Sequence, residues 1–347
     1  MRSGHDFRYA ARVAATLALA ALGGLAANLA GVPAGWVAGG LLAVAAASLA
    51  GFETEFPAPL RHPVFLVLGV YSGTGVTQET LRQMQTWPAS FAILAVSVVA
   101  LIAASHWWLN GRCGWARNDA LLSSLPGALS FVLAAAEDLR ADMRRVSIAQ
   151  SIRLLILIEA IPFVALFVGH PSVHAAAARP DASARELALL FGSAIIASLV
   201  MDRLRIPGAW LLGGLAASAA LLLSGIVDAR LPLYLIVPCT IALGAIAGSR
   251  IRPGDLRLLP AIAGPALGAF AIAIAISAVA AIAVTLLFGV NIFQTLLAFA
   301  PGALEVLTVI AFQMNIDPAY VAAHHVARFI ALVFAVPIIA RWLARRA

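Results

Sequence analysis

The chain has 347 residues, of which 62% are hydrophobic and 11% are charged. Soluble domains carry about 25% charged residues, so this composition cannot cover a water-exposed surface and excludes a soluble enzyme. The net charge of +7 comes from arginine alone, because the sequence contains no lysine. The arginines lie mostly in short segments between apolar runs, which is typical of membrane topology rather than of a basic face that binds nucleic acid.

Apolar runs long enough to cross, or nearly cross, a hydrocarbon core of ~30 Å recur along the whole chain. The first series covers residues 13–30, 33–49, 63–76, 88–109, 120–136 and 145–168. The second series covers residues 186–201, 207–225, 233–248, 260–288, 292–312 and 318–343. These runs predict an all-α, multi-pass membrane helix bundle with about 10–12 transmembrane segments. We expect it in a bacterial inner membrane, with the lipid bilayer as its main partner.

The N-terminal arginines before the run at 13–30 also fit a signal peptide. Further apolar runs follow at once, and this favours a retained first transmembrane helix.

The second series repeats landmarks of the first. The motif Pro-x-x-Trp-x-x-Gly-Gly-Leu occupies residues 33–41 and again 207–215, a shift of 174. Pro-Gly-Ala-Leu occupies residues 126–129 and again 301–304, a shift of 175. Internal repeats of this kind are typical of transporter folds. The sequence therefore predicts a first membrane repeat at 13–169, a linker at 170–186 and a second repeat at 187–345.

The orientation of the two repeats depends on the number of spans in each. An odd number makes the repeats inverted, and an even number makes them parallel. With the N-terminus inside and six spans per repeat, Arg250, Arg252 and Arg257 would lie outside, against the positive-inside rule. One non-spanning segment per repeat removes this conflict, so we favour inverted repeats with one broken helix in each.

A proline and a glycine interrupt one apolar run in each repeat. Proline removes a backbone donor and glycine tolerates unwound backbone, so Pro126-Gly127 predicts a break and a half-helix that begins near Gly127. Asp142 is the predicted N-cap of the following helix, and Asp317-Pro318 is its counterpart. Arg153 lies eleven residues after Asp142, or about 16 Å along the helix axis, which is close to the bilayer midplane.

Arginine forks and helix N-termini both bind anions, and charges at the bilayer centre usually mark a solute path. We therefore predict a binding site for a small, anionic solute. Its candidate residues are Pro126, Gly127, Ala128, Ser130, Gln150 and Arg153 in the first repeat and Pro301, Gly302, Ala303, Glu305, His325 and Arg328 in the second.

The alternative is structural. Arg153 would then pair with Glu159, Glu137 or Asp138, Arg328 would pair with Glu305, and the break would be a hinge.

Other features favour packing over chemistry. Gly39-Gly40 and Gly213-Gly214 predict close helix contacts. Cys113 and Cys239 have no metal or redox spacing, and we find no metal-ligand cluster, nucleotide loop or pair of catalytic carboxylates. The sequence therefore predicts no enzyme activity, metal or cofactor, and it leaves the oligomeric state open, including a homo-oligomer.

The duplicated pattern resembles the bacterial AbrB family of membrane proteins, over about residues 15–345. The resemblance rests on the Pro-Trp-Gly-Gly motif, on the Pro-Gly-Ala-Leu blocks, and on Arg153 and Arg328 downstream of them. Family members often continue with an acidic residue after the proline block, and here only Glu305 keeps that position. The resemblance implies a tandem AbrB duplication domain.

Members of that family are labelled either as regulators of gene expression or as ammonia monooxygenases. The chain lacks the small β-rich domain of the soluble DNA-binding proteins that share the name, so no direct nucleic-acid partner is expected. Copper ligands for a monooxygenase are not recognisable. We favour a secondary transporter or permease, with an indirect regulator of gene expression as the alternative and a monooxygenase as the weakest hypothesis.

Overall fold

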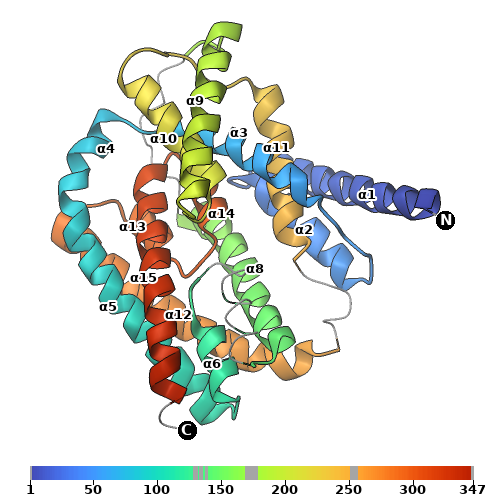
Figure 1. Cartoon of the computed structure of the whole chain (residues 1–347), viewed down its shortest axis with the longest axis vertical. Coiled ribbons are helices and arrows are strands. Elements are labelled where there is room, and N and C mark those ends of the chain that lie inside the picture. The colour runs from blue at the N-terminus through green and yellow to red at the C-terminus, as the bar shows by residue number, and fades with distance from the viewer. Residues whose placement is uncertain are drawn as a thin grey trace. The chain divides into compact units, whose positions relative to one another are not determined.

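The computed structural model describes residues 2–127, 132, 136, 140–168, 179–250 and 257–344. Within these residues the chain is helical and contains no strand (Figure 1). The predicted all-α class is confirmed.

The helices follow the predicted apolar runs. In the first half they are α1 (Arg2–Leu29), α2 (Gly35–Leu49), α3 (Arg61–Gly73), α4 (Gln78–Gln83), α5 (Trp87–His106), α6 (Arg117–Ser124) and α8 (Met143–Val168). In the second half they are α9 (Ala184–Arg203), α10 (Ala209–Leu223), α11 (Leu233–Gly248), α12 (Leu259–Phe288), α13 (Ile292–Phe299), α14 (Leu304–Gln313) and α15 (Pro318–Ala344). Short turns of 3-10 helix, η1 (Ala58–Leu60) and η2 (Met84–Thr86), and a π-helical turn, η3 (Trp107–Arg112), flank α3 and α5.

Four helical segments of the described chain are long and apolar enough to cross a membrane: Arg8–Leu29, Gln78–Arg112, Ala184–Arg203 and Leu259–Phe288. They expose large apolar side chains, such as Leu22 at 66%, Val96 at 71% and Leu286 at 80%. Such surfaces are unfavourable in water and require lipid. The chain is therefore a helical membrane protein, while the full number of spans and their orientation stay predictions.

Corresponding helices recur at the shift seen in the sequence. Helices α2 and α10 each have 15 residues, and their bounds differ by 174. Helices α6 and α13 each have 8 residues, and their bounds differ by 175. This spacing is consistent with a duplication, but the duplication and its inverted orientation remain predictions.

The chain forms two compact units, and neither follows the predicted repeat boundaries. The first unit comprises Met1–Thr80, Ile158–Leu256 and Glu305–Ala319. The second unit comprises Leu81–Leu157, Arg257–Leu304 and Tyr320–Ala347. Each unit thus combines segments from both halves of the sequence.

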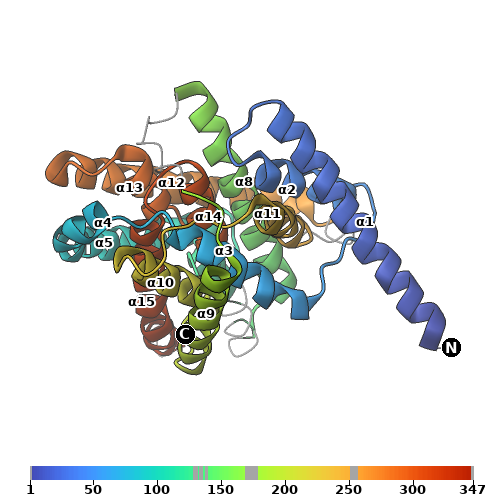
Figure 2. The same cartoon turned by 90° about the horizontal axis from the view of Figure 1, so that it is seen from above.

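In the first unit, the glycine-rich helices pack closely. Helix α2 lies against α1 and α11, and α10 lies against α9 and α3 (Figure 2). A Cβ atom at Gly39 would lie 2.1 Å from the carbonyl oxygen of Gly23, and one at Gly213 would lie 2.4 Å from the backbone nitrogen of Ser198. No side chain fits at such distances, so the packing interpretation of the Gly-Gly motif is confirmed.

In the second unit, α5 packs against α6 and α12, and α12 packs against α13. Helix α6 ends at Ser124, where Leu125 takes an extended conformation. Helix α13 ends at Phe299, and α14 begins at Leu304. The predicted interruptions at the two prolines are thus confirmed. Gly302 has φ +127°, a conformation that side chains disfavour, which explains the glycine there.

Aspartate caps the helix after each interruption. Asp142 Oδ1 accepts hydrogen bonds from the backbone nitrogens of Arg144 at 3.1 Å and Arg145 at 3.0 Å. Asp317 Oδ1 accepts one from the backbone nitrogen of Ala319 at 2.8 Å. Both predicted caps are confirmed, and they set where α8 and α15 begin.

Removing a cap should cost stability. We expect Asp317→Ala to lower the free energy of unfolding by about 1 kcal/mol, because a helix-terminal N–H loses its acceptor. Asp317→Asn keeps an acceptor oxygen and should cost less. Thermal unfolding of both variants in detergent checks this, and equal stability of Asp317→Ala and the wild type would contradict it.

Candidate functional site

The first buried arginine binds the C-terminal end of a half-helix. Arg153, on α8, is 6% exposed. Its Nη1 donates a hydrogen bond to the carbonyl oxygen of Leu125 at 2.9 Å, and its Nη2 donates to Gln150 Oε1. Gln150 Nε2 in turn donates to the carbonyl oxygens of Leu122 at 2.8 Å and Leu125 at 3.1 Å.

The second buried arginine, on α15, repeats this arrangement with a histidine. Arg328 is 3% exposed, and its Nη2 lies in hydrogen-bond contact with His325 Nδ1. His325 Nε2 lies 3.0 Å from the carbonyl oxygen of Leu297, near the C-terminus of α13. A carbonyl only accepts, so Nε2 carries the proton and Nδ1 accepts from the arginine. His325 is therefore neutral in this arrangement.

Gln150 and His325 perform the same task. Each donates to a carbonyl at the end of a half-helix and accepts from the arginine one helical turn later. The last carbonyls of a helix lack partners and carry partial negative charge, so amide, imidazole and guanidinium donors stabilise them. This orients both guanidinium groups within the buried second unit.

Neutral acceptors hold the arginines but do not cancel their charges. The charge of Arg153 acts electrostatically on Arg328 within the same unit. Arg153 Nε and Arg328 Nη1 are buried and have no hydrogen-bond partner in the described part of the chain. No ion pair involves either arginine among those residues. Among the described residues, the site thus presents unmatched positive charge and free N–H groups.

The interruption in the second half of the sequence lies against the arginine from the first half. A Cβ atom at Gly302 would lie 3.6 Å from Arg153 Nη2 and 3.9 Å from its Nε. The backbone of Gly302 therefore lies against the unpartnered Nε edge of the Arg153 guanidinium.

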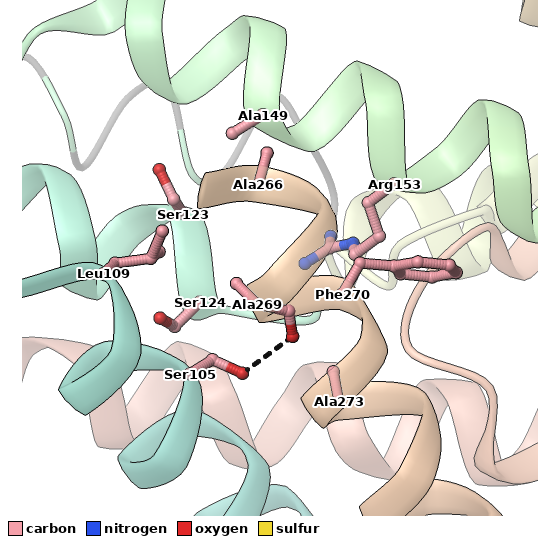
Figure 3. Close-up of a pocket in the computed structure, with 10 residues that line it drawn as sticks. All are labelled: Ser105, Leu109, Ser123, Ser124, Ala149, Arg153, Ala266, Ala269, Phe270 and Ala273. Carbon is pink, nitrogen blue, oxygen red and sulfur yellow. Dashed lines mark hydrogen bonds between the residues drawn. The ribbon is translucent and has the colours of Figure 1, made fainter. Parts of the chain in front are cut away.

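A narrow pocket reaches Arg153 from between α5, α6 and α12. Its lining, drawn in Figure 3, is Ser105, Leu109, Ser123, Ser124, Ala149, Arg153, Ala266, Ala269, Phe270 and Ala273. It is narrow and partly open to the outside, with room for about one water molecule. Ser105 donates to the carbonyl oxygen of Ala269 at 3.2 Å, while Ser123 Oγ has no described partner. Alanines and hydroxyls suit a small solute.

The structure brings together part of the predicted site. Arg153, Gln150, His325 and Arg328 are buried in the second unit. The buried members also include Pro126, Gly127, Pro301 and Gly302, whereas Ala303 is half-buried. Ala128 and Ser130 lie outside the described residues, as do Glu137 and Asp138 of the structural alternative.

The other acidic candidates belong to the first unit. Glu305 is half-buried and interacts electrostatically with Arg250. Glu159 is 8% exposed, and neither carboxylate oxygen has a hydrogen-bond partner among the described residues. The structure therefore gives Glu305 a basic neighbour from its own unit.

Sequence reasoning missed two features of the site. It named no contact to the C-terminal carbonyls of the preceding half-helix, to which Arg153 and His325 bind. It also missed the serines and alanines of the pocket. The spacing of three residues between Gln150 and Arg153, repeated by His325 and Arg328, was the available signal for the first feature.

The shared role of Gln150 and His325 gives a matched pair of variants. His325→Gln should keep anion affinity within about threefold, because an amide can donate to Leu297 and accept from Arg328. His325→Leu should lower it by about tenfold or more, since Arg328 then loses its orienting acceptor. Binding isotherms of the two purified variants check this. Equal affinities would contradict the orienting role.

Apolar helices long enough to cross a bilayer, with buried arginines in one unit, define a helical membrane protein. The AbrB family profile, described as "Transition state regulatory protein AbrB", matches residues 36–344. The chain belongs to this family.

Two relatives resemble the chain over most of its length. A protein of Escherichia coli (strain K12) described as "Putative regulator AbrB" is 28% identical over 335 residues, which cover 94% of each chain. The "Uncharacterized protein YhjN" of Bacillus subtilis (strain 168) is 23% identical over 352 residues, covering 92% of this chain and 90% of the relative. No solved structure matches the chain.

Proposed function

We propose that the protein is a secondary transporter for a small organic or inorganic anion that binds beside Arg153 and Arg328. The observation that carries this proposal is the pair of buried guanidinium groups with unpartnered N–H donors and no acidic partner among the described residues. Burying one unpaired charge in a membrane protein costs several kcal/mol, and two like charges near each other cost more.

An anion removes this cost. A carboxylate or phosphate accepts from the free donors and neutralises the positive charge in a region of low dielectric constant. Structural arginines, by contrast, are expected to have a carboxylate of the chain as partner. The unmatched charge therefore favours a ligand over a permanent ion pair.

The pocket supports a restriction on solute size. Ala266, Ala269 and Ala273 line one wall of it from α12, and the Ser105 hydroxyl on α5 points to the Ala269 carbonyl (Figure 3). Small walls and few polar groups disfavour large metabolites, and even a small anion fits this narrow pocket only if its walls move apart.

Uptake into proteoliposomes tests the proposal. Vesicles containing the purified full-length protein should take up labelled acetate, succinate or phosphate with saturation, above the rate of protein-free vesicles. Unlabelled competitor should suppress that uptake. If none of the three anions binds or enters, the proposal fails.

The name of the E. coli relative favours a second candidate, a membrane protein that affects gene expression indirectly. In that case a deletion strain complemented by a transport-deficient variant should regain the wild-type transcript pattern. Under the transporter proposal, any transcript change persists in that strain, because it follows from loss of solute movement.

A further inference from the structure

A second buried histidine lies next in sequence to the anion site. His324, on α15, is fully buried. Its Nδ1 lies 2.8 Å from the carbonyl oxygen of Tyr320, and its Nε2 lies 2.8 Å from Ser90 Oγ on α5. Ser90 Oγ also lies 2.8 Å from the Tyr320 hydroxyl. The three side chains form one buried cluster within the second unit.

The partners fix the proton positions in this cluster. The Tyr320 carbonyl can only accept, so Nδ1 of His324 carries the ring proton and Nε2 holds a lone pair. Ser90 then donates to Nε2, and the Tyr320 hydroxyl donates to Ser90. His324 is thus a neutral base whose Nε2 lone pair accepts from a hydroxyl that can reverse its hydrogen bond.

The surroundings would accommodate a cation on that ring. The ring centroid of His324 lies 4.0 Å from that of Tyr320, 4.6 Å from Phe91 and 5.8 Å from Phe299. Aromatic rings at such distances stabilise a buried cation.

Positive charge from the anion site opposes that cation. Arg328, on the same helix, acts electrostatically on His324. A charge on His324 would in turn act on His325. The side chains packed on it from α5 and α13 carry no charge: Trp87, Ser90, Phe91 and Phe299. Burial of the ring opposes protonation of His324 most, and Arg328 is the charged side chain that adds to this opposition among the described residues.

We propose that His324 is a proton-binding site coupled to the anion site, so that the protein carries its anion together with a proton. This inference rests on the proposed transport function. A proton from bulk solvent binds the Nε2 lone pair, and Ser90 reverses to accept from Nε2–H and donate to the Tyr320 oxygen, whose own hydroxyl proton rotates away from Ser90. A bound anion cancels the charge of Arg328, which permits the second positive charge.

The coupling is reciprocal, because each ligand stabilises the state that the other prefers. Anion affinity should therefore rise as pH falls, by up to about tenfold per pH unit where one proton enters with each anion.

Calorimetric titration of the purified full-length protein tests the coupling. Acetate and sulfate serve as probes, since neither changes charge between about pH 6 and 8. Titrations in buffers of different ionisation enthalpy give the number of protons taken up per anion. The wild type should take up one, whereas His324→Gln should bind with no proton uptake and with a flat pH profile.

Two further variants keep the test decisive. His62→Gln removes a histidine that stacks on Trp210 in the first unit, so proton uptake should remain. Ser90→Ala keeps the imidazole of His324 but removes the hydroxyl that accepts a hydrogen bond from the protonated ring. Proton uptake by this variant should therefore shift to lower pH. This measurement stands even if His324→Gln fails to fold.

The outcomes separate the two proposals. Anion binding by the wild type without proton uptake, or uptake unchanged in His324→Gln or in Ser90→Ala, overturns the proton site and leaves the transporter intact. Absence of binding by both probes overturns the anion site and the coupling with it.

Discussion

Arg153→Gln and Arg328→Gln should each weaken anion binding by about 100-fold, because each removes a charge-assisted donor in a buried site worth about 3 kcal/mol. Uptake into vesicles should fall to the protein-free rate in both variants. Arg153→Lys should rescue little, since a lysine keeps the charge but not the fork that reaches both Leu125 and Gln150.

The same helix supplies a control. Arg145 lies on α8 and contacts Asp119 at 3.3 Å, with 37% of its side chain exposed. Arg145→Gln should therefore leave anion affinity near the wild-type value. Binding at wild-type affinity by folded Arg153→Gln and Arg328→Gln would contradict the site.

Stability distinguishes a binding site from a structural hinge. Without anion, Arg328→Gln should be as stable as the wild type or more stable, because it removes an unmatched buried charge. If the arginines instead join helices through ion pairs, breaking one pair should cost about 3–5 kcal/mol. Thermal unfolding of Arg328→Gln and the wild type, with and without added acetate, distinguishes a binding site from a structural ion pair.

The largest stability effect is expected where α3 crosses α10. A Cβ atom at Gly69 would lie 2.1 Å from the carbonyl oxygen of Leu211, so Gly69→Val should force these helices apart. Overpacking of this kind costs about 1–3 kcal/mol or more, and in a membrane bundle it threatens assembly. We expect Gly69→Val to lose most of the folded, monodisperse protein in size-exclusion chromatography.

A glycine without close neighbours gives the matched control. A Cβ atom at Gly192, on α9, meets no atom within 4 Å. Gly192→Ala should therefore be neutral or stabilise the protein by up to about 1 kcal/mol. Wild-type yield and stability of Gly69→Val would show that the close approach of α3 and α10 is not required.

Local chemistry made much of this fold predictable. Pro126 and Pro301 end helices because they remove a donor and clash with the preceding turn, and Asp142 and Asp317 begin the next helices as caps. Gly39 and Gly213 predict close packing because only hydrogen fits between the backbones. Each of these effects acts within a few residues or on one helix face.

The contacts that complete the site depend on tertiary structure. The distance of Arg153 from its cap gives its depth along α8 but not its partner, which is the Leu125 carbonyl of another segment. The two compact units likewise combine segments from both halves of the chain, so repeat boundaries in the sequence could not give them. Ala266 and Ala269 carry no signature of a pocket until α12 is placed against α5.

Anomalous diffraction from crystals soaked in selenate, an analogue of the sulfate probe, would test the central claim most directly. We expect one strong selenium peak next to the guanidinium groups of Arg153 and Arg328, lost in Arg328→Gln. A map with no peak there, and with a carboxylate of the chain such as Glu137 or Asp138 paired to these arginines, would contradict it.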